Sequence, residues 1–80
     1  MEKVLIVDDD KHIAELISLY MMKDGFETKE VFNGNDVIAA FNSFKPNIVL
    51  LDLMLPGKDG NIVLREIRKK SAVPVIMITA

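Results

Sequence analysis

Four aspartates in this 80-residue chain have the type and spacing that could form a metal-binding or catalytic site. Asp8, Asp9 and Asp10 follow one apolar run, and Asp52 ends another. Carboxylates that lie close together raise each other's proton affinity unless a cation neutralises them. A site made only of oxygen ligands suits a hard divalent cation, Mg²⁺ more than Zn²⁺. The acids therefore predict a magnesium site, provided that the fold brings them together.

Helix capping is the structural alternative for an acid that follows a strand. Asp10 suits an N-cap, because an apolar pattern of helical spacing begins directly after it. Capping explains at most one of Asp8, Asp9 and Asp52. Asp52 also stands within an apolar stretch, residues 48–55, where an unpaired carboxylate is costly. We therefore expect Asp10 to cap a helix and the other three acids to be functional.

Three short apolar segments predict strands. Residues 4–7 and 47–52 are typical of strands covered on both faces, and residues 74–79, again nearly all apolar, are expected to form the last strand. Residues 26–32 instead alternate apolar and charged side chains. This alternation indicates a strand at the edge of a sheet, where charge prevents pairing with other chains.

Three helices are expected between these strands. The first begins after Asp10, has apolar residues at positions 13, 16, 17, 20 and 21, and ends at Gly25 as its C′ residue. The turn 33–35 precedes a second helix with apolar positions 37, 38, 41 and 44, and Pro46 stops it. The third begins near Ile62 and closes with Arg65, Arg68, Lys69 and Lys70, whose charges suit the helix dipole.

The predicted order is βαβαβαβ, an α/β fold. Apolar strands that alternate with single helices indicate a parallel sheet with right-handed crossovers and helices on both faces. Sites in such doubly wound sheets form at the carboxyl ends of the strands. If the first and third strands are neighbours, Asp8, Asp9 and Asp52 meet at one edge of the sheet.

Composition excludes several classes of function. A net charge of -2 argues against a nucleic-acid-binding surface. The absence of Cys leaves no thiolate zinc site and no cysteine nucleophile. No apolar run is long enough to span a bilayer and no signal peptide is visible, so we expect a cytoplasmic location and no membrane partner.

Three motifs in register resemble the receiver domain of two-component response regulators. They are VLIVDDD at residues 4–10, LLDLMLPGKDG at residues 50–60 and PVIMITA at residues 74–80. The resemblance implies a flavodoxin-like sheet with strand order 2-1-3-4. The middle motif most resembles receivers that precede a winged-helix DNA-binding domain.

The resemblance also implies roles for individual residues. Asp52 is then the phosphoacceptor, which attacks the phosphohistidine of a sensor histidine kinase. Mg²⁺ is held by Asp9 directly, by Asp8 through water, by Asp52 and by the backbone carbonyl of Met54. Thr79 is the switch residue that contacts the phosphoryl group. Such a domain is a signalling domain rather than an enzyme, although it assists its own phosphorylation and dephosphorylation.

Receivers continue beyond the position of Ala80 with a further helix, strand and helix, so residues 1–80 are expected to form the N-terminal part of a receiver domain. The later strand carries a lysine that pairs with the phosphoryl group. Lys58 is in the wrong place to replace it and is expected to be a solvated loop charge. The apolar final strand then becomes an open edge, which predicts self-association through that strand and the uncovered sheet face.

Other functions remain as alternatives. A fragment that folds by self-association but does not accept phosphate shares every motif with an active receiver. A phosphatase of the haloacid-dehalogenase type needs a second Asp two residues after the nucleophile, where this chain has Met54. A flavin carrier needs a hydroxyl- and Gly-rich phosphate loop after the first strand, where this chain has three acids.

Overall fold

The chain folds around one parallel sheet, as the computed structural model shows for residues 1–78, the part that it describes. The strands run in the order β2-β1-β3-β4, which confirms the predicted flavodoxin-like arrangement. The elements in chain order are β1 (Lys3–Val7), α1 (Lys11–Lys23), β2 (Glu27–Val31), the short 3-10 helix η1 (Gly34–Asp36), α2 (Val37–Phe44), β3 (Ile48–Asp52), α3 (Gly60–Arg68) and β4 (Val75–Ile78).

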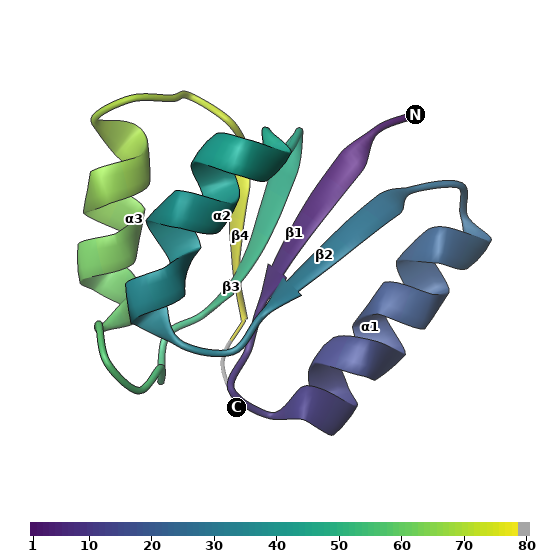
Figure 1. The fold of residues 1–80 in the computed structure, drawn as a ribbon, viewed down its shortest axis with the longest axis horizontal. Helices are drawn as coiled ribbons and strands as arrows, with labels where there is room; N and C mark the ends of the chain where they lie inside the picture. Colours follow the sequence, from purple (N-terminus) through teal and green to yellow (C-terminus); the bar gives the residue numbers. More distant parts are fainter. Residues whose placement is uncertain (79–80) are drawn as a thin grey trace.

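The register of the sheet aligns the carboxyl ends of β1 and β3. Strand β1 pairs in parallel with both β2 and β3, and Val7 lies opposite Val31 on one side and Leu51 on the other. Asp8 and Asp52 each follow these paired residues, so they lie at the same level of neighbouring strands. The carboxyl ends of the strands are at the lower end of the sheet in Figure 1.

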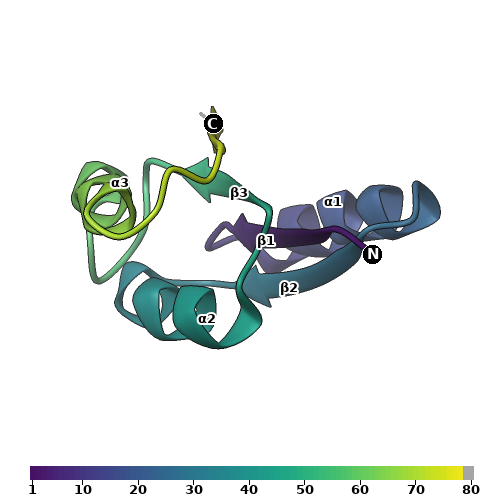
Figure 2. The same cartoon turned by 90° about the horizontal axis from the view of Figure 1, so that it is seen from above.

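Helices cover both faces of the sheet, α1 on one and α2 with α3 on the other (Figures 1 and 2). The α2–α3 side holds the larger group of buried apolar residues, which comprises Leu5, Val7, Val31, Val37, Ala40, Phe41, Val49, Leu51, Val63 and Ile67. The α1 side holds fewer, namely Val4, Ile6, Ala14 and Leu50. No helix among residues 1–78 has the length and apolar character needed to cross a membrane.

Helix α1 begins and ends as predicted but turns a different face to the sheet. The Asp10 carboxylate accepts the N–H groups of residues 12 and 13, and Gly25 has a φ of 93° after the last turn. The buried residues are Ala14 and Ser18, whereas residues 13, 16 and 20 are exposed. Small side chains permit close approach to the sheet, and the Ser18 hydroxyl lies 2.6 Å from the Thr28 hydroxyl on β2. The expectation that the large apolar residues of α1 form its packed face is therefore wrong in part.

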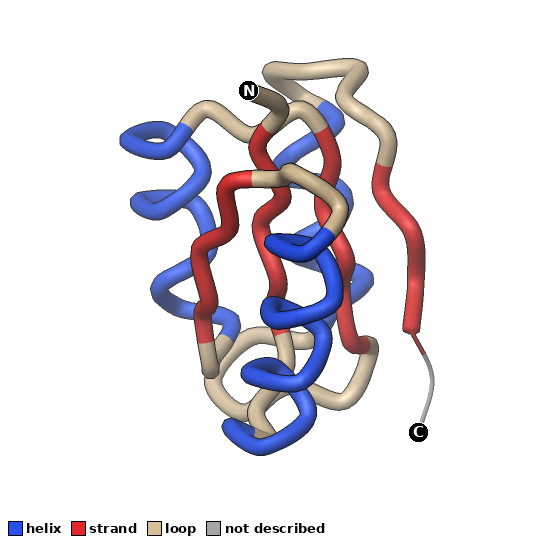
Figure 3. The backbone as a smooth tube through the Cα atoms, turned by 90° about the vertical axis from the view of Figure 1, so that its right-hand side faces the viewer, coloured by secondary structure: helices blue, strands red, loops and turns tan. Residues whose placement is uncertain are grey.

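The two outer strands differ in character. Strand β2 carries exposed Glu27 and Lys29, as an edge strand does. Strand β4 forms the other edge of the described sheet (Figure 3), pairs only with β3 among these strands, and leaves Ile76 51% exposed. An apolar side chain is thus open to solvent on an unpaired edge.

Candidate acidic site at the carboxyl ends of β1 and β3

Three carboxylates meet where β1 and β3 end. Asp8, Asp9 and Asp52 each offer an oxygen atom, and these atoms lie within 4.8 Å of one another. Asp8 and Asp9 follow β1, whereas Asp52 is the last residue of β3. The parallel register therefore brings together acids that are more than forty positions apart in the chain.

Asp8 is the most constrained of the three. Its side chain accepts the Asp10 N–H at 2.9 Å, its own N–H donates to the Val31 carbonyl at 3.0 Å, and only 4% of the residue is exposed. Burial raises the pKa of the Asp8 carboxyl above its ordinary value, and the negative charges of Asp52, Asp9 and Asp10 raise it further. The Asp10 N–H opposes this rise of the pKa.

Asp52 is held in a similar way and is 5% exposed. Its Oδ1 accepts the Met54 N–H at 3.0 Å, which fixes the orientation of the carboxylate. The Met54 side chain itself is 74% exposed and does not pack in the core. Its backbone, not its side chain, belongs to the site.

Asp9 and Asp10 have separate positions. Asp9 is exposed, and one of its oxygens faces the cluster. Asp10 caps α1 through Oδ1, which accepts the N–H groups of His12 and Ile13 at 3.0 and 3.2 Å. The structure therefore confirms capping for Asp10 and groups the other three acids.

The cluster fits a hard divalent cation. Its donor atoms are carboxylate oxygens, and no His or Cys belongs to the group. The mutual repulsion that raises the pKa of Asp8 would be offset by positive charge at the same place. The chemistry and the spacing of these oxygens therefore suit Mg²⁺.

Two other predicted positions have different outcomes. Thr79, the predicted switch residue, lies outside the described residues, as does Ala80. Lys58 does not stand free as a solvated charge, because its Nζ forms an ion pair with the Glu66 carboxylate at 3.0 Å. This part-buried pair joins the loop after β3 to α3.

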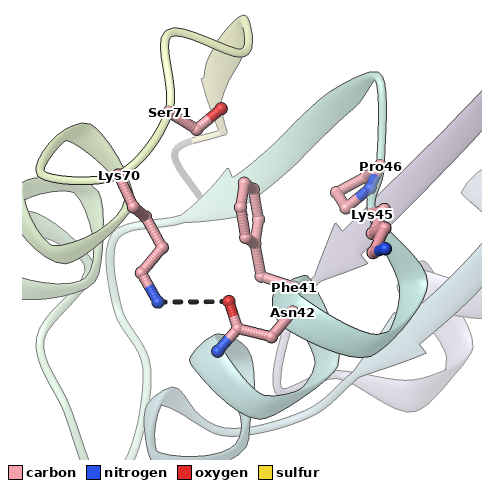
Figure 4. A pocket seen from close by; sticks show the side chains of 6 residues that line it. All are labelled: Phe41, Asn42, Lys45, Pro46, Lys70 and Ser71. Carbon is pink, nitrogen blue, oxygen red and sulfur yellow. Dashed lines mark hydrogen bonds between the residues drawn. The ribbon is translucent and has the colours of Figure 1, made fainter.

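A pocket of about 490 Å³ lies at the opposite end of the sheet, between the C-terminal ends of α2 and α3 (Figure 4). Its lining includes Lys45 and Lys70, and Lys70 Nζ donates to Asn42 Oδ1 at 3.1 Å. Both lysines lie beside the carbonyl ends of helices, where positive charge is stabilising. None of the predicted site residues lines this pocket.

Comparison with known proteins identifies the family. Residues 4–80 match the response regulator receiver domain, and the chain belongs to this family of signalling domains. The fold and the acidic cluster at the ends of β1 and β3 agree with that membership.

Several solved receiver domains are similar to the chain. The BeF3-activated N-terminal receiver domain of RstA from Klebsiella pneumoniae is 33% identical, with a TM-score of 0.94 over 98% of this chain and 67% of that one. The response regulator TrrA from Thermotoga maritima, solved in complex with Mg²⁺-BeF, is 36% identical, with a TM-score of 0.92 over 100% and 70%. The N-terminal domain of a response regulator receiver protein from Methanoculleus marisnigri is 31% identical, with a TM-score of 0.92 over 100% of this chain and 68% of that one.

Proposed function

We propose that this chain is a phosphoacceptor, and that Asp52 accepts a phosphoryl group from the phosphohistidine of a sensor histidine kinase. The observation that supports the proposal is the group of three carboxylate oxygens within 4.8 Å at the carboxyl ends of β1 and β3. Asp52 ends β3 with its carboxylate fixed by the Met54 N–H. A carboxylate in a fixed orientation is suited to nucleophilic attack.

The proposed reaction exchanges one bond to phosphorus for another. A carboxylate oxygen of Asp52 bonds to phosphorus while the phosphorus–nitrogen bond of the phosphohistidine breaks. The bonding electron pair leaves with the imidazole nitrogen, and the product on this chain is an acyl phosphate. Thr79 is proposed to donate its hydroxyl to a phosphoryl oxygen in that product.

Magnesium is the proposed cofactor. Asp8, Asp9, Asp52 and the backbone carbonyl of Met54 would hold the ion, and the TrrA complex with Mg²⁺-BeF supports this choice. When bound, the ion supplies positive charge that offsets the negative charge of the transferring phosphoryl group. The residues of this chain orient the Asp52 carboxylate and exclude part of the solvent from it.

Intact-mass measurement tests the proposal. The protein is incubated with Mg²⁺ and a small acyl-phosphate donor, and we expect the addition of one phosphoryl group. Asp52→Asn is expected to abolish the addition, whereas Asp24→Asn, at the far end of α1, is expected to keep it. If the folded chain gains no phosphoryl group, the alternative of a fragment that folds by self-association without phosphotransfer is favoured.

Residues 1–80 are proposed to be the N-terminal part of a receiver domain that controls a winged-helix, DNA-binding output. The sequence of residues 53–60 supports the subfamily, and the chain spans about two-thirds of the length of the receiver domains it matches. This chain alone, with a net charge of -2, is expected to leave the mobility of DNA unchanged in a gel-shift assay.

Self-association through β4 is proposed as a property of the chain. A cavity of about 420 Å³ lies on the α1 side of the sheet, and apolar residues including Phe26, Leu50 and Ile76 line it. Burying this surface and the β4 edge against a second copy would remove apolar area from water. Sedimentation at several concentrations tests the proposal, and a monomer mass at every concentration would contradict it.

A further inference from the structure

Two loops meet beside the acidic site although they are far apart in the chain. One is the turn 33–36 between β2 and α2, and the other is the loop 53–59 between β3 and α3. The Gly34 N–H donates a hydrogen bond of 2.9 Å to the Pro56 carbonyl, which also accepts the Lys58 N–H at 3.1 Å. The carbonyl of Pro56 thus links the two loops.

Contact at Gly34 is backbone against backbone. Gly34 is buried, and a Cβ atom added to it would lie 2.5 Å from Lys58 Cβ and 2.7 Å from Lys58 N. On the other side, Gly57 has a φ of 83°, and a Cβ atom there would lie 2.5 Å from Asn35 Nδ2. A side chain at Gly34 therefore requires the two loops to move apart, whereas at Gly57 it requires the Asn35 side chain to turn away and strains the backbone at a positive φ.

The loop 53–59 is also fixed where it begins and ends. A Cβ atom at Gly60 would lie 2.8 Å from both the Asp52 carbonyl oxygen and Leu53 Cα, so the two ends of the loop touch. The Gly60 N–H donates to the Leu53 carbonyl at 3.2 Å. Between these closed ends, the Lys58–Glu66 ion pair ties the loop to α3 and Leu55 packs against the core. The turn 33–36 adds a hydrogen bond to the backbone of the loop itself, at the Pro56 carbonyl.

We propose that the turn 33–36 is a positioning element for the phosphoacceptor site. Gly34 holds Pro56 and Lys58 in place, and their position sets the backbone at Met54, only two residues before Pro56. The Met54 N–H in turn fixes the Asp52 carboxylate at 3.0 Å. The positioning role rests on the proposed function of Asp52, but the contacts between the turn, the loop and Asp52 are present without any ligand.

Gly34→Ala tests this role, and Gly25→Ala is its matched control. Gly25 has a φ of 93° but no atom within 4 Å of an added Cβ, and it lies at the end of the sheet opposite the acids. Its substitution therefore strains the backbone without touching the site. Both variants are compared by circular dichroism, by hydrogen exchange of the Met54 amide in metal-free protein, and by titration with Mg²⁺.

The expected result is selective for Gly34. Met54 exchange in Gly34→Ala should become faster than in Gly25→Ala at equal global stability, and the dissociation constant for Mg²⁺ should rise about tenfold, as when groups that orient metal ligands are removed. The positioning role is overturned if Met54 exchange and Mg²⁺ affinity are the same in the two variants. Failure of the proposed function is a separate result, because it appears as absence of phosphorylation in the unmodified chain.

A second variant keeps the test decisive if Gly34→Ala does not fold. Asn33→Ala removes the cap of the turn, in which Asn33 Nδ2 donates to Asp36 Oδ2 at 2.7 Å and Asn33 Oδ1 accepts the Asp36 N–H at 3.1 Å. It adds no atoms at the contact. Faster exchange at Met54 is again the expected result, and unchanged exchange overturns the positioning role.

Discussion

Asp8 and Asp52 are held by the same local geometry on neighbouring strands. Each accepts, through Oδ1, the backbone N–H of the residue two positions further along the chain, at 2.9 and 3.0 Å. The parallel register sets the two turns side by side. Two nearly buried acids thus face each other at fixed positions, and their repulsion is part of the folded state.

Removing the charge of Asp8 is expected to stabilise the metal-free protein. The pKa of Asp8 is raised by folding, so the folded state binds its proton more tightly than the unfolded state does. The free energy of unfolding therefore falls as pH rises from the ordinary pKa of 3.8 to the raised folded value, and the loss persists above it. Asp8→Asn should be more stable than the parent chain at pH 7 but not at pH 3, as measured by urea unfolding. An equal advantage at both pH values would contradict this origin.

Magnesium is expected to stabilise the folded chain. A ligand that binds only the folded state adds about 2.7 kcal/mol at one hundred times its dissociation constant. Urea unfolding with and without Mg²⁺, at matched ionic strength, measures this increase. Asp9→Asn should lose most of this increase, because it removes one of the three clustered carboxylates. Asp9 is exposed, so its substitution should disturb little else in the fold. Asp24→Asn, far from the cluster, serves as the control, and equal loss in both variants would argue against the site.

Loss of the α1 cap is expected to destabilise the fold. Asp10→Ala leaves the N–H groups of His12 and Ile13 without their acceptor and should cost about 1 kcal/mol in the free energy of unfolding. Asp10→Asn should cost much less, because the amide oxygen still accepts these hydrogen bonds. If the two variants were equally unstable, the charge of Asp10 rather than the cap would be responsible.

Truncation of a buried side chain in β3 should cost far more stability than truncation of an exposed one in the loop that follows. Leu51 is fully buried, and Leu51→Ala should cost about 3 kcal/mol through lost burial and the cavity left behind. Met54→Ala, three residues further on, should change stability little because its side chain is exposed. Chemical unfolding measures both, and a large effect at Met54 would show that its side chain packs against something outside the described contacts.

The buried strands can be predicted from the sequence, because every position of a strand that is covered on both faces must be apolar. A parallel strand with helices on both faces requires apolar side chains at successive positions, and residues 4–7 and 48–51 have them. Acids directly after such runs stand at the edge of the sheet, where sites form. The grouping of Asp8, Asp9 and Asp52 therefore needed only the order of the strands in addition.

Features that depend on contacts between distant segments were not predictable. The predicted residues Ile17 and Met21 do pack on the core side of α1, but its fully buried residues are Ala14 and Ser18, whose small size signals close approach only once the sheet is known. The ion pair between Lys58 and Glu66 depends on how the loop folds back onto α3. The sequence predicts a turn at Gly34, but the contact of this turn with Pro56 bridges twenty-two positions and leaves no periodic pattern.

The two faces of the sheet bury unequal amounts of apolar side chain, and this asymmetry determines which helix should unfold locally first. Helix α1 rests on a small buried group, whereas α2 and α3 share the larger one. Segments with few buried apolar contacts open with the lowest free energy. Under mild denaturant the amides of α1 should therefore exchange with solvent before those of α3. One part of the chain, made of β1, β3, α2 and α3, should then stay folded while α1 is detached, and α1 should dock onto it last. Asp8 and Asp9, which connect that part to α1, lie at the boundary between the two.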